Sequence, residues 1–519
     1  MLEDAIFGPV VSRRCVLRAL AASSALLVGA PGLEAQTDLS GYWVLLVPTG
    51  DGNYRKTFLY LEQSGHTVTG EVMYGARKLP ISNGNFQDGK LHFEVVVHFQ
   101  QQTRQIVYDG QMAGGTIDMK INFPGRSPMT GTAERTTREA TLPPKPLPLP
   151  ALRDLPDNGL VRTPPMGWNS WNKFAGRVDD SIVRAAADAI VASGMAKVGY
   201  TYINIDDTWQ GQRDKSGRIT GNKKFPDMKA LCDYVHSKGL KIGIYSSPGP
   251  TTCAGYEGSF GHEELDAQTY AEWGFDYLKY DWCSAAEIYK DEEMRPVYQK
   301  MGEALQKTGR PIVYSLCQYG RDDVWGWGAK VGGNLWRTTG DINDHWERMD
   351  EIGFSQFAIQ HYMKPGHWND PDMLEVGNGG MTNDEYRTHM SLWCLLAAPL
   401  LAGNDLSSMT EETREILMNT EVIAIDQDRA ANPAKLATPL GKHVVAYRKL
   451  SDGSTAVAFF NRNAKEDEIG VEWAAVEIEG GNIQARDLWK HQDVQVSPTR
   501  YSTKVPAHGV VMLRVQQRS

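Results

Sequence analysis

The chain has 519 residues, a formal net charge of -9 at pH 7, and a composition of 41% hydrophobic and 23% charged residues. This length exceeds the roughly 250 to 300 residues at which a single hydrophobic core stops growing, so two or three domains are expected. The acidic balance excludes the basic footprint with which proteins bind nucleic acid, while the 14 Trp and 21 Tyr fit either sugar stacking or ordinary cores.

Residues 1–35 have the pattern of a signal peptide. The basic stretch SRRCVLR, residues 12–18, precedes the apolar run ALAASSALLVGA and then small residues. This run of about 12 residues is shorter than the ~20 that cross a bilayer, so no membrane span is expected. The Arg13 and Arg14 pair resembles a twin-arginine export signal, with a general secretory signal as the alternative. Both interpretations predict export to the periplasm or beyond.

Residues 37–138 predict an antiparallel β domain. Their alternating runs, such as KTFLYLEQ and KLHFEVVVHF, are punctuated by Gly, Asn and Asp. The next stretch contains TLPPKPLPLPALRDLP, which is rich enough in proline to predict a stiff, extended linker over residues 139–160. The first domain boundary is therefore expected near residue 138.

Residues 161–432 alternate between strand and helix patterns. Eight strand candidates start near residues 166, 202, 240, 275, 311, 335, 367 and 392. About 270 residues of this alternation predict an α/β fold, a (β/α)8 TIM barrel, with an open doubly wound sheet as the structural alternative. Residues 433–519 return to runs such as STAVAFFNR and predict a C-terminal antiparallel β-sandwich.

The predicted strand ends carry acidic and aromatic residues, which is where the catalytic side chains of such barrels lie. In YLKYDWC, alternation along a strand places Lys279 and Asp281 on one face, and LWRTTGDI aligns Arg337 with Asp341 in the same way. Further strand-end candidates are Trp168, Trp171, Asp206, Asp207, Trp209, Tyr245, Asp370 and Asp372. Two opposed carboxylates are what glycoside hydrolysis requires. The alternative is a set of salt bridges and caps at the barrel ends.

Several separated motifs resemble glycoside hydrolase family 27, the α-galactosidase and α-N-acetylgalactosaminidase family. They include TPPMGWNSWNKF, YINIDDTWQG, GLKIGIYSSPG, LWRTTGDI and WNDPDML, which follow one another in the family's order. The resemblance runs from about Thr163 into the C-terminal sandwich and leaves out the N-terminal β domain. It implies a retaining exo-glycosidase that hydrolyses terminal α-D-galactosidic bonds in oligo- or polysaccharides, with no metal or organic cofactor.

The resemblance also implies the roles of individual residues. Asp281 matches the nucleophile, expected to be ionised with help from Lys279, and Asp341 matches the general acid/base, expected to hold a proton. Their carboxylates are expected ~5 to 6.5 Å apart. Asp206 and Asp207 match the pair that binds the 6- and 4-hydroxyls of the sugar. All positions matching sugar-binding residues are Trp168, Asp206, Asp207, Tyr245, Lys279, Gln318, Arg337, Asp372 and Met373.

One stretch departs from the family pattern. Many α-galactosidases read CEW where this chain reads CQY, with Gln318 in the middle. In the family, that stretch contacts the 2-substituent of the sugar, so α-N-acetylgalactosaminides are alternative substrates. β-L-arabinopyranosides are a further alternative. A non-catalytic carbohydrate-binding protein with a decayed barrel is the alternative from another class.

The cysteines allow a disulfide but no complete framework. Six are present, and Cys15 lies in the predicted signal peptide, which leaves an odd number. The sequence has no CxxC pair or HExxH motif, so no zinc site is expected. The resemblance implies a disulfide between Cys253 and Cys283 that closes the loop beside the nucleophile. The cysteines expected to stay free are Cys232, Cys317 and Cys394.

Overall fold

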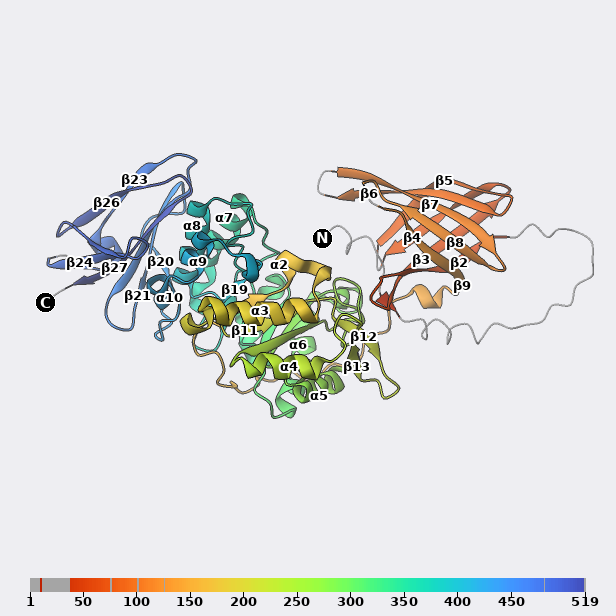
Figure 1. Ribbon diagram of the computed structural model, residues 1–519, viewed down its shortest axis with the longest axis horizontal. Helices are drawn as coiled ribbons and strands as arrows, with labels where there is room; N and C mark the ends of the chain where they lie inside the picture. The colour runs from red at the N-terminus through yellow and green to blue at the C-terminus, as the bar shows by residue number, and fades with distance from the viewer. Residues whose placement is uncertain are drawn as a thin grey trace, which may run out of the picture.

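The structure is a computed structural model that describes residues 10–11, 38–74, 77–99, 102–125, 127–479 and 481–517. A central barrel lies between an N-terminal β domain and a C-terminal pair of sheets (Figure 1). The predicted signal peptide lies outside the described residues, except for Val10–Val11, which form β1 beside β3. Among the helices described, none is long and apolar enough to cross a membrane.

The N-terminal region forms a closed antiparallel barrel. β3 pairs with both β2 and β4, so the order β3-β2-β9-β8-β7-β6-β5-β4 returns to its start. Alternation along β2 turns Trp43, Leu45 and Val47 inward, where each is at most 3% exposed. The strands are β2 (Gly41–Pro48), β3 (Tyr54–Ser64), β4 (Thr67–Tyr74), β5 (Arg77–Gln87), β6 (Lys90–Phe99), β7 (Gln102–Ala113), β8 (Thr116–Asn122) and β9 (Met129–Thr136).

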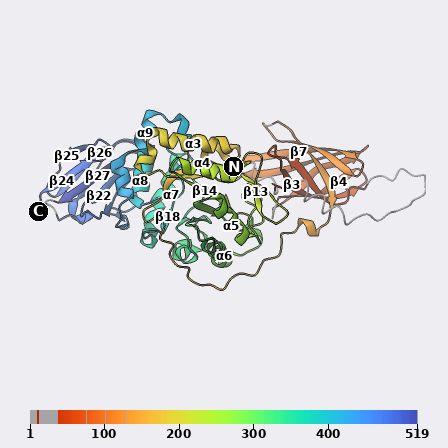
Figure 2. The same ribbon diagram turned by 60° about the horizontal axis from the view of Figure 1, so that its bottom comes forward.

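The proline-rich segment that follows runs along the surface of the central barrel (Figure 2). After a 3-10 turn at Glu139–Thr141, it has no regular secondary structure until residue 166. Its backbone is held against α6 (Met294–Lys307) by the Gln299 amide, which donates to the carbonyl of Ala151 at 2.8 Å. Further along, the N–H of Leu155 donates to the carbonyl of Lys330 at 2.8 Å. The segment is therefore fixed to the barrel at several points.

The central region is a parallel eight-stranded barrel, as predicted. The strand order is β18-β17-β16-β15-β14-β11-β10-β19, and a parallel bridge between Leu374 and Ala402 closes the ring, which excludes an open sheet. The strands are β10 (Met166–Asn169), β11 (Tyr202–Asn204), β14 (Lys241–Ser246), β15 (Tyr277–Asp281), β16 (Val313–Cys317), β17 (Leu335–Arg337), β18 (Trp368–Asp370) and β19 (Leu400–Ala402). Seven starts lie within two residues of the predicted ones.

The predicted start of the eighth strand, near residue 392, is wrong. Residues 392–396 belong to α8 (Asn383–Leu396), which begins at a capping box between Thr382 and Glu385. The helix ends at Ala397, whose φ of 52° lies in the left-handed region, and β19 follows three residues later. The long apolar run therefore contains a buried helix end and a buried strand, which periodicity alone does not separate.

Helices cover the outside of the barrel. In α3 (Asp180–Ser193) the buried residues Val183, Ala187 and Ile190 recur at helical spacing. Its N-terminus is capped by Asp179, which accepts a hydrogen bond from the N–H of Ile182. The other helices of the described chain include α2 (Trp171–Phe174), α4 (Met228–Ser237), α5 (Glu263–Trp273), α7 (Trp346–Ser355), α9 (Glu411–Leu417) and α10 (Thr420–Asp426).

The C-terminal region is antiparallel, as predicted, and packs on the barrel. In β21 (His443–Lys449), Val444 and Ala446 join the core of the barrel, while Val445 and Tyr447 join a second core. One six-stranded sheet and one two-stranded sheet are formed. The other strands are β20 (Lys435–Leu436), β22 (Thr455–Asn461), β23 (Asp467–Glu472), β24 (Ile483–Asp487), β25 (Gln492–Val494), β26 (Arg500–Val505) and β27 (Val510–Gln517).

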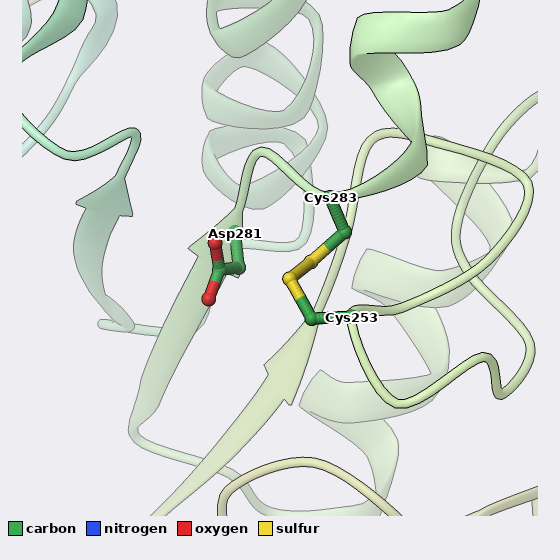
Figure 3. Close-up of side chains that lie close together, drawn as sticks. All are labelled: Cys253, Asp281 and Cys283. Carbon is green, nitrogen blue, oxygen red and sulfur yellow. A yellow bond between two sulfur atoms is a disulfide. The ribbon is translucent and has the colours of Figure 1, made fainter. Parts of the chain in front are cut away.

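A disulfide joins Cys253, in the loop after β14, to Cys283, just beyond β15 (Figure 3). This is the disulfide that the family resemblance implied. The cysteines left free in the described part of the chain are Cys232, Cys317 and Cys394, and all three are buried. The bond ties the loop to the strand that carries Asp281.

Replacing Cys253 and Cys283 together with alanine is expected to lower the free energy of unfolding by about 3 to 4 kcal/mol, because the bond closes a loop spanning a sequence separation of 30 residues. Urea unfolding of the double variant measures the loss. The unmodified protein with a reductant should show a matching loss. Thiol titration of denatured, unreduced protein without residues 1–35 should find the three free cysteines, and five thiols would contradict the disulfide.

Candidate active site

A cavity of about 660 Å³ opens at the C-terminal ends of the barrel strands. The structure brings most of the predicted site residues to its wall. Those that line it are Asp206, Asp207, Tyr245, Lys279, Asp281, Arg337, Asp341, Asp372 and Met373. They come from β11, β14, β15 and β17 or from the loops that follow the strands, so residues far apart in the sequence converge on one site.

Asp281 ends β15, and its carboxylate is held by two phenol groups. Tyr245 donates to Oδ2 at 3.1 Å and Tyr319 donates to Oδ1 at 2.7 Å. Burial raises the pKa of Asp281 to about 6, although the charge of Lys279 and the hydrogen bond from Tyr319 act to lower it. Both hydroxyls stabilise the charged form and fix the orientation of the carboxylate.

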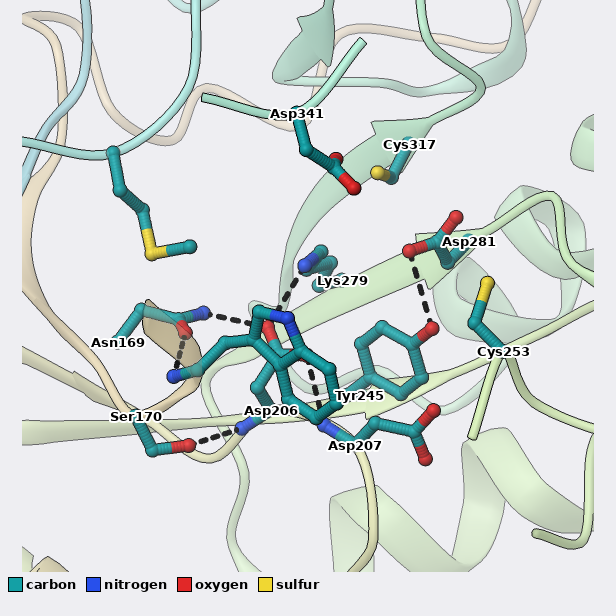
Figure 4. A network of polar contacts seen from close by, with 12 residues as sticks. Asn169, Ser170, Asp206, Asp207, Tyr245, Cys253, Lys279, Asp281, Cys317 and Asp341 are labelled. Carbon is teal, nitrogen blue, oxygen red and sulfur yellow. Dashed lines mark hydrogen bonds and ion pairs between the residues drawn. The ribbon is translucent and has the colours of Figure 1, made fainter. Parts of the chain in front are cut away.

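Lys279 and Asp206 form an ion pair beneath Asp281 (Figure 4). The distance from Lys279 Nζ to Asp206 Oδ2 is 2.8 Å, and the amide of Asn169 donates to the same oxygen at 2.9 Å. Burial acts to lower the pKa of Lys279, but Asp206 outweighs it together with other negative groups, so this pKa is raised. The ammonium group therefore stays charged at the wall of the cavity.

Asp207 is fully enclosed and is held by the backbone. Its Oδ2 accepts from the N–H of Ala254 at 2.8 Å, and its Oδ1 accepts from the N–H of Thr208 at 2.6 Å. Burial raises the pKa of Asp207 to about 7, although the hydrogen bond from Ala254 acts to lower it. The side chain is thus oriented by neighbours on two separate loops.

Arg337 connects Asp341 with Asp372. Its Nη2 lies 3.0 Å from Asp341 Oδ1 and 2.8 Å from Asp372 Oδ2. β17 ends at Arg337, so Asp341 lies on the following loop and not on the strand, contrary to the alternation predicted for LWRTTGDI. Burial acts to raise the pKa of Asp341, but Arg337 and Lys279 outweigh it and hold this pKa below its usual value. These two cations therefore favour ionised Asp341, where the family mechanism needs a proton.

Asp281 and Asp341 nevertheless face each other across the cavity above Lys279 (Figure 4). The side chain of Asp341 is 56% exposed, whereas Asp281 is 5% exposed. A bound ligand would remove water from the more exposed carboxylate and raise its pKa. The two carboxylates therefore differ in solvation, and Asp281 is the more buried of the pair.

Trp168 does not contact the cavity, which corrects its predicted place in the wall. It is 0% exposed, and its indole N–H donates to the carbonyl of Asn404 at 2.9 Å within the core. The tryptophan that lines the cavity is Trp171, at the start of α2. Because β10 ends at Asn169, the chain turns before Trp171. The side chain of this second tryptophan of TPPMGWNSWNKF therefore points into the cavity.

Gln318 is also absent from the cavity wall. It is 0% exposed, its amide has no hydrogen-bond partner, and the next residue, Tyr319, lines the cavity instead. Tyr319 has a φ of 64°, so the chain leaves β16 in the left-handed region and turns this ring toward Asp281. Within CQY, the residue that contacts the cavity is therefore Tyr319.

Sequence reasoning also missed an acidic group on the far side of the cavity. Glu375 accepts from the amides of Asn172 and Asn378, the latter at 2.7 Å. Burial raises the pKa of Glu375 to about 7, although both amides act to lower it. Asp344 also lines this side and accepts from the hydroxyl of Tyr386. The only available signals were isolated polar residues in loops, which sequence patterns do not distinguish from caps.

A metal centre has no support from the described residues. The group of potential ligands found there consists of Cys253, Asp281 and Cys283 (Figure 3). Its two sulfur atoms are bonded to each other, so neither is a thiolate that could bind an ion. The arrangement is thus a disulfide beside a carboxylate.

Comparison with known families gives two matches that adjoin each other in the chain. Residues 163–428 match the model described as "Alpha galactosidase A", and residues 441–515 match the "Alpha galactosidase C-terminal beta sandwich domain". A curated relative, "Alpha-galactosidase" of Cyamopsis tetragonoloba, is 46% identical over 372 residues, which covers 71% of this chain and 89% of the relative.

Solved structures agree with these matches. Alpha-galactosidase I from Mortierella vinacea superposes with a TM-score of 0.68 at 38% identity, covering 70% of this chain and 99% of that one. A putative alpha-galactosidase/melibiase from Bacteroides fragilis superposes with a TM-score of 0.67 at 34% identity and covers 85% of this chain and 92% of that one. The second superposition covers more of this chain than the barrel and the C-terminal sheets provide.

Proposed function

Because this chain belongs to glycoside hydrolase family 27, the α-galactosidase family, and is a glycoside hydrolase of that kind, we propose that it removes terminal α-D-galactose from oligo- or polysaccharides by double displacement. Asp281 is the nucleophile and Asp341 is the general acid/base. The observation that supports this proposal most directly is the facing pair of carboxylates above the Lys279–Asp206 ion pair.

In the first step, the Asp281 carboxylate attacks the anomeric carbon and the bond to the leaving oxygen breaks. Asp341 gives its proton to that oxygen, so the leaving sugar departs as an alcohol. Tyr245 and Tyr319 hold the attacking carboxylate in place. In the second step, Asp341 takes a proton from water, which attacks the glycosyl ester and releases galactose with its original anomeric configuration.

The polar wall of the cavity suits galactose. On the family pattern, Asp206 accepts from the 6-hydroxyl, and Asp207 and Lys279 bind the axial 4-hydroxyl. A site built to bond a hydroxyl rejects an analogue that lacks it, because a buried carboxylate would be left unpaired. We therefore favour α-galactosides over β-L-arabinopyranosides and α-glucosides. Gln318 supplies no argument for a 2-acetamido sugar, since it does not reach the cavity.

Export is the other part of this proposal. The disulfide Cys253–Cys283 is of the kind that persists in oxidising compartments, and residues 12–18 supply the basic stretch of an export signal. A galactose-containing oligo- or polysaccharide met outside the cytoplasm is then the natural substrate.

The stereochemical outcome tests the roles of the two aspartates. The first sugar released from an α-galactoside is expected to be the α-anomer, because two inversions at one carbon give net retention. Proton NMR of the anomeric signals, recorded before mutarotation, measures it. Initial release of the β-anomer would contradict the assignment of Asp281 as nucleophile.

The pH dependence of kcat/KM tests the electrostatics of the same pair. Activity requires that Asp281 and Asp341 together hold one proton. They do so at pH values between the lowered pKa of Asp341 and the pKa of about 6 of Asp281. We therefore expect kcat/KM to fall above about pH 6, because both carboxylates are then ionised and no acid remains. A rate that stays flat to pH 8 on nitrophenyl α-galactoside would contradict this scheme.

Removing the phenol of Tyr319 should alter that profile. The Tyr319→Phe variant loses a hydrogen bond that favours ionised Asp281, so its alkaline limb is expected to move to higher pH. kcat/KM should also fall about tenfold at the optimum, the size of one bond to a charged group. Tyr234→Phe, which removes a hydroxyl bonded to Asp188 outside the cavity wall, is the matched control. An unmoved limb in Tyr319→Phe would refute the role of this bond.

Substrate preference tests Asp206. Nitrophenyl α-galactoside should be the best substrate in a panel with the α-N-acetylgalactosaminide, the β-L-arabinopyranoside and the α-glucoside. Asp206→Ala should lose most of the preference for galactoside over arabinopyranoside, because the partner of the 6-hydroxyl is gone. The ratio of the two kcat/KM values is the measurement, since freeing Lys279 also lowers both rates. If another glycoside is best for the unmodified protein, the galactose assignment is wrong.

A further inference from the structure

A buried turn of the N-terminal barrel contacts the central barrel. Residues 49–53 connect β2 to β3, and Asp51 is 8% exposed. Its Oδ2 accepts from the hydroxyl of Tyr256 at 2.7 Å, and its backbone carbonyl accepts from the N–H of Lys223 at 3.3 Å. Asn53 donates to the carbonyl of Gln210 at 3.3 Å. Figure 1 shows β12 (Gln210–Arg213) and β13 (Ile219–Gly221) on the side of the barrel that faces the N-terminal strands.

The turn is shaped for this contact before it meets the barrel. Asp51 Oδ1 accepts from the hydroxyl of Thr49 at 2.5 Å and from the N–H of Asn53 at 3.0 Å, which leaves Oδ2 to point outward. Gly52 has a φ of 98°, and a Cβ there would lie 2.9 Å from the side chain of Lys223. Glycine suits this position because other residue types rarely adopt such a φ.

Beyond the turn, Tyr256 belongs to the loop that forms one rim of the cavity. The N–H of Thr252 donates to the carbonyl of Tyr256 at 2.8 Å, and the hydroxyl of Thr252 accepts from the N–H of Tyr256 at 3.0 Å. Cys253 and Ala254 lie between them. The N–H of Ala254 donates to Asp207 at 2.8 Å, and Cys253 lines the cavity. A shift of Tyr256 would therefore move a hydrogen bond to Asp207.

A second route leads from Asp51 to the other oxygen of Asp207. The amide of Asn222 lies 3.4 Å from Asp51 Oδ2 and donates to the carbonyl of Thr208 at 2.8 Å. The N–H of Thr208 donates to Asp207 Oδ1. Thr208 has a φ of 80°, a conformation that a threonine rarely adopts and that its surroundings must hold. Asp51 thus contacts Tyr256 of the rim loop directly and reaches the Thr208 segment through Asn222.

We propose that Asp51 is a positioning residue for Asp207, so that the N-terminal β domain is a working part of the sugar site. The turn holds the rim loop and the strained Thr208 segment in the geometry that presents Asp207 to the 4-hydroxyl. The proposal deepens the α-galactosidase function and rests on it. It assigns this domain a role that differs from both a spacer and a separate polysaccharide-binding module.

The test uses full-length Asp51→Ala, Tyr256→Phe and the double variant. Each single variant should lower kcat/KM on nitrophenyl α-galactoside by about 5- to 30-fold, mainly through KM, as expected for the loss of one buried hydrogen bond. The double variant should lose little more than Asp51→Ala alone, because the bond that Tyr256→Phe removes is already absent there. In Asp51→Asn the amide oxygen can still accept from the N–H of Asn53 while its NH2 donates to the hydroxyl oxygen of Tyr256, so this variant should recover most of the activity.

The preference for galactoside over nitrophenyl α-glucoside separates positioning from general damage. It should fall in Asp51→Ala, because Asp207 is proposed to read the 4-hydroxyl, whereas simple destabilisation lowers both rates alike. Asp118→Ala, on the exposed face of β8 in the same domain, is the matched control and should match the unmodified enzyme. Melting temperatures of all variants show whether each one folds.

Two outcomes would overturn the inference without touching the proposed function. One is unchanged kcat/KM in folded Asp51→Ala, and the other is a loss shared equally by galactoside and glucoside. Additive losses in the double variant would also refute the shared bond. If the unmodified enzyme does not act on α-galactosides at all, the proposed function itself fails, and the two failures remain distinct.

Discussion

The ion pair between Lys279 and Asp206, 2.8 Å apart, is the interaction on which the rest of the cavity depends. Seven carboxyl groups line this space but only three basic side chains do, and removing charge from water is costly without a partner. Lys279 neutralises one carboxylate directly, and its charge limits the rise in the pKa of Asp281 and helps to lower the pKa of Asp341. Burial of Asp207 and Glu375 raises the pKa of each to about 7. A wall that mixes protonated and ionised carboxyls offers both donors and acceptors, which suits a neutral ligand covered in hydroxyls.

The barrel fold and the place of Asp281 at its mouth could be predicted because they follow from short-range periodicity, whereas the role of Asp281 as nucleophile was implied by the family resemblance and remains a proposal. Alternation with period two puts Lys279 and Asp281 on one face of β15, and the ends of parallel barrel strands meet at one mouth. The eighth strand could not be placed in this way, since the buried end of α8 and β19 form one apolar run. Where burial is complete, polar residues no longer mark the boundary between elements.

The remaining parts of the site depend on backbone conformations that residue types do not encode. Thr208, Tyr319 and Asp372 all have φ between 64° and 91°, and each one borders the cavity or orients a residue within it. A threonine, tyrosine or aspartate in the sequence does not indicate a left-handed backbone conformation, which glycine and asparagine favour. This is why Gln318 was expected in the wall where Tyr319 stands. Trp171 lines the cavity in place of Trp168 for a related reason. β10 ends between the two residues, so the alternation of the strand no longer determines which side chain points into the cavity.

The contact between the N-terminal barrel and the central barrel could not be predicted from the sequence. The proline-rich connection of the N-terminal barrel predicted a stiff, extended linker, and the structure adds that this linker is bonded along α6 and that the β2–β3 turn is bonded to the rim loop. The contact between Asp51 and Tyr256 joins residues 205 positions apart, so no local pattern contains it. A carboxylate buried at such a junction is costly unless every oxygen is bonded, and Asp51 meets that condition only when both barrels hold their places. The junction therefore selects one relative position of the two barrels, and that position is the one in which the segments holding Asp207 are fixed.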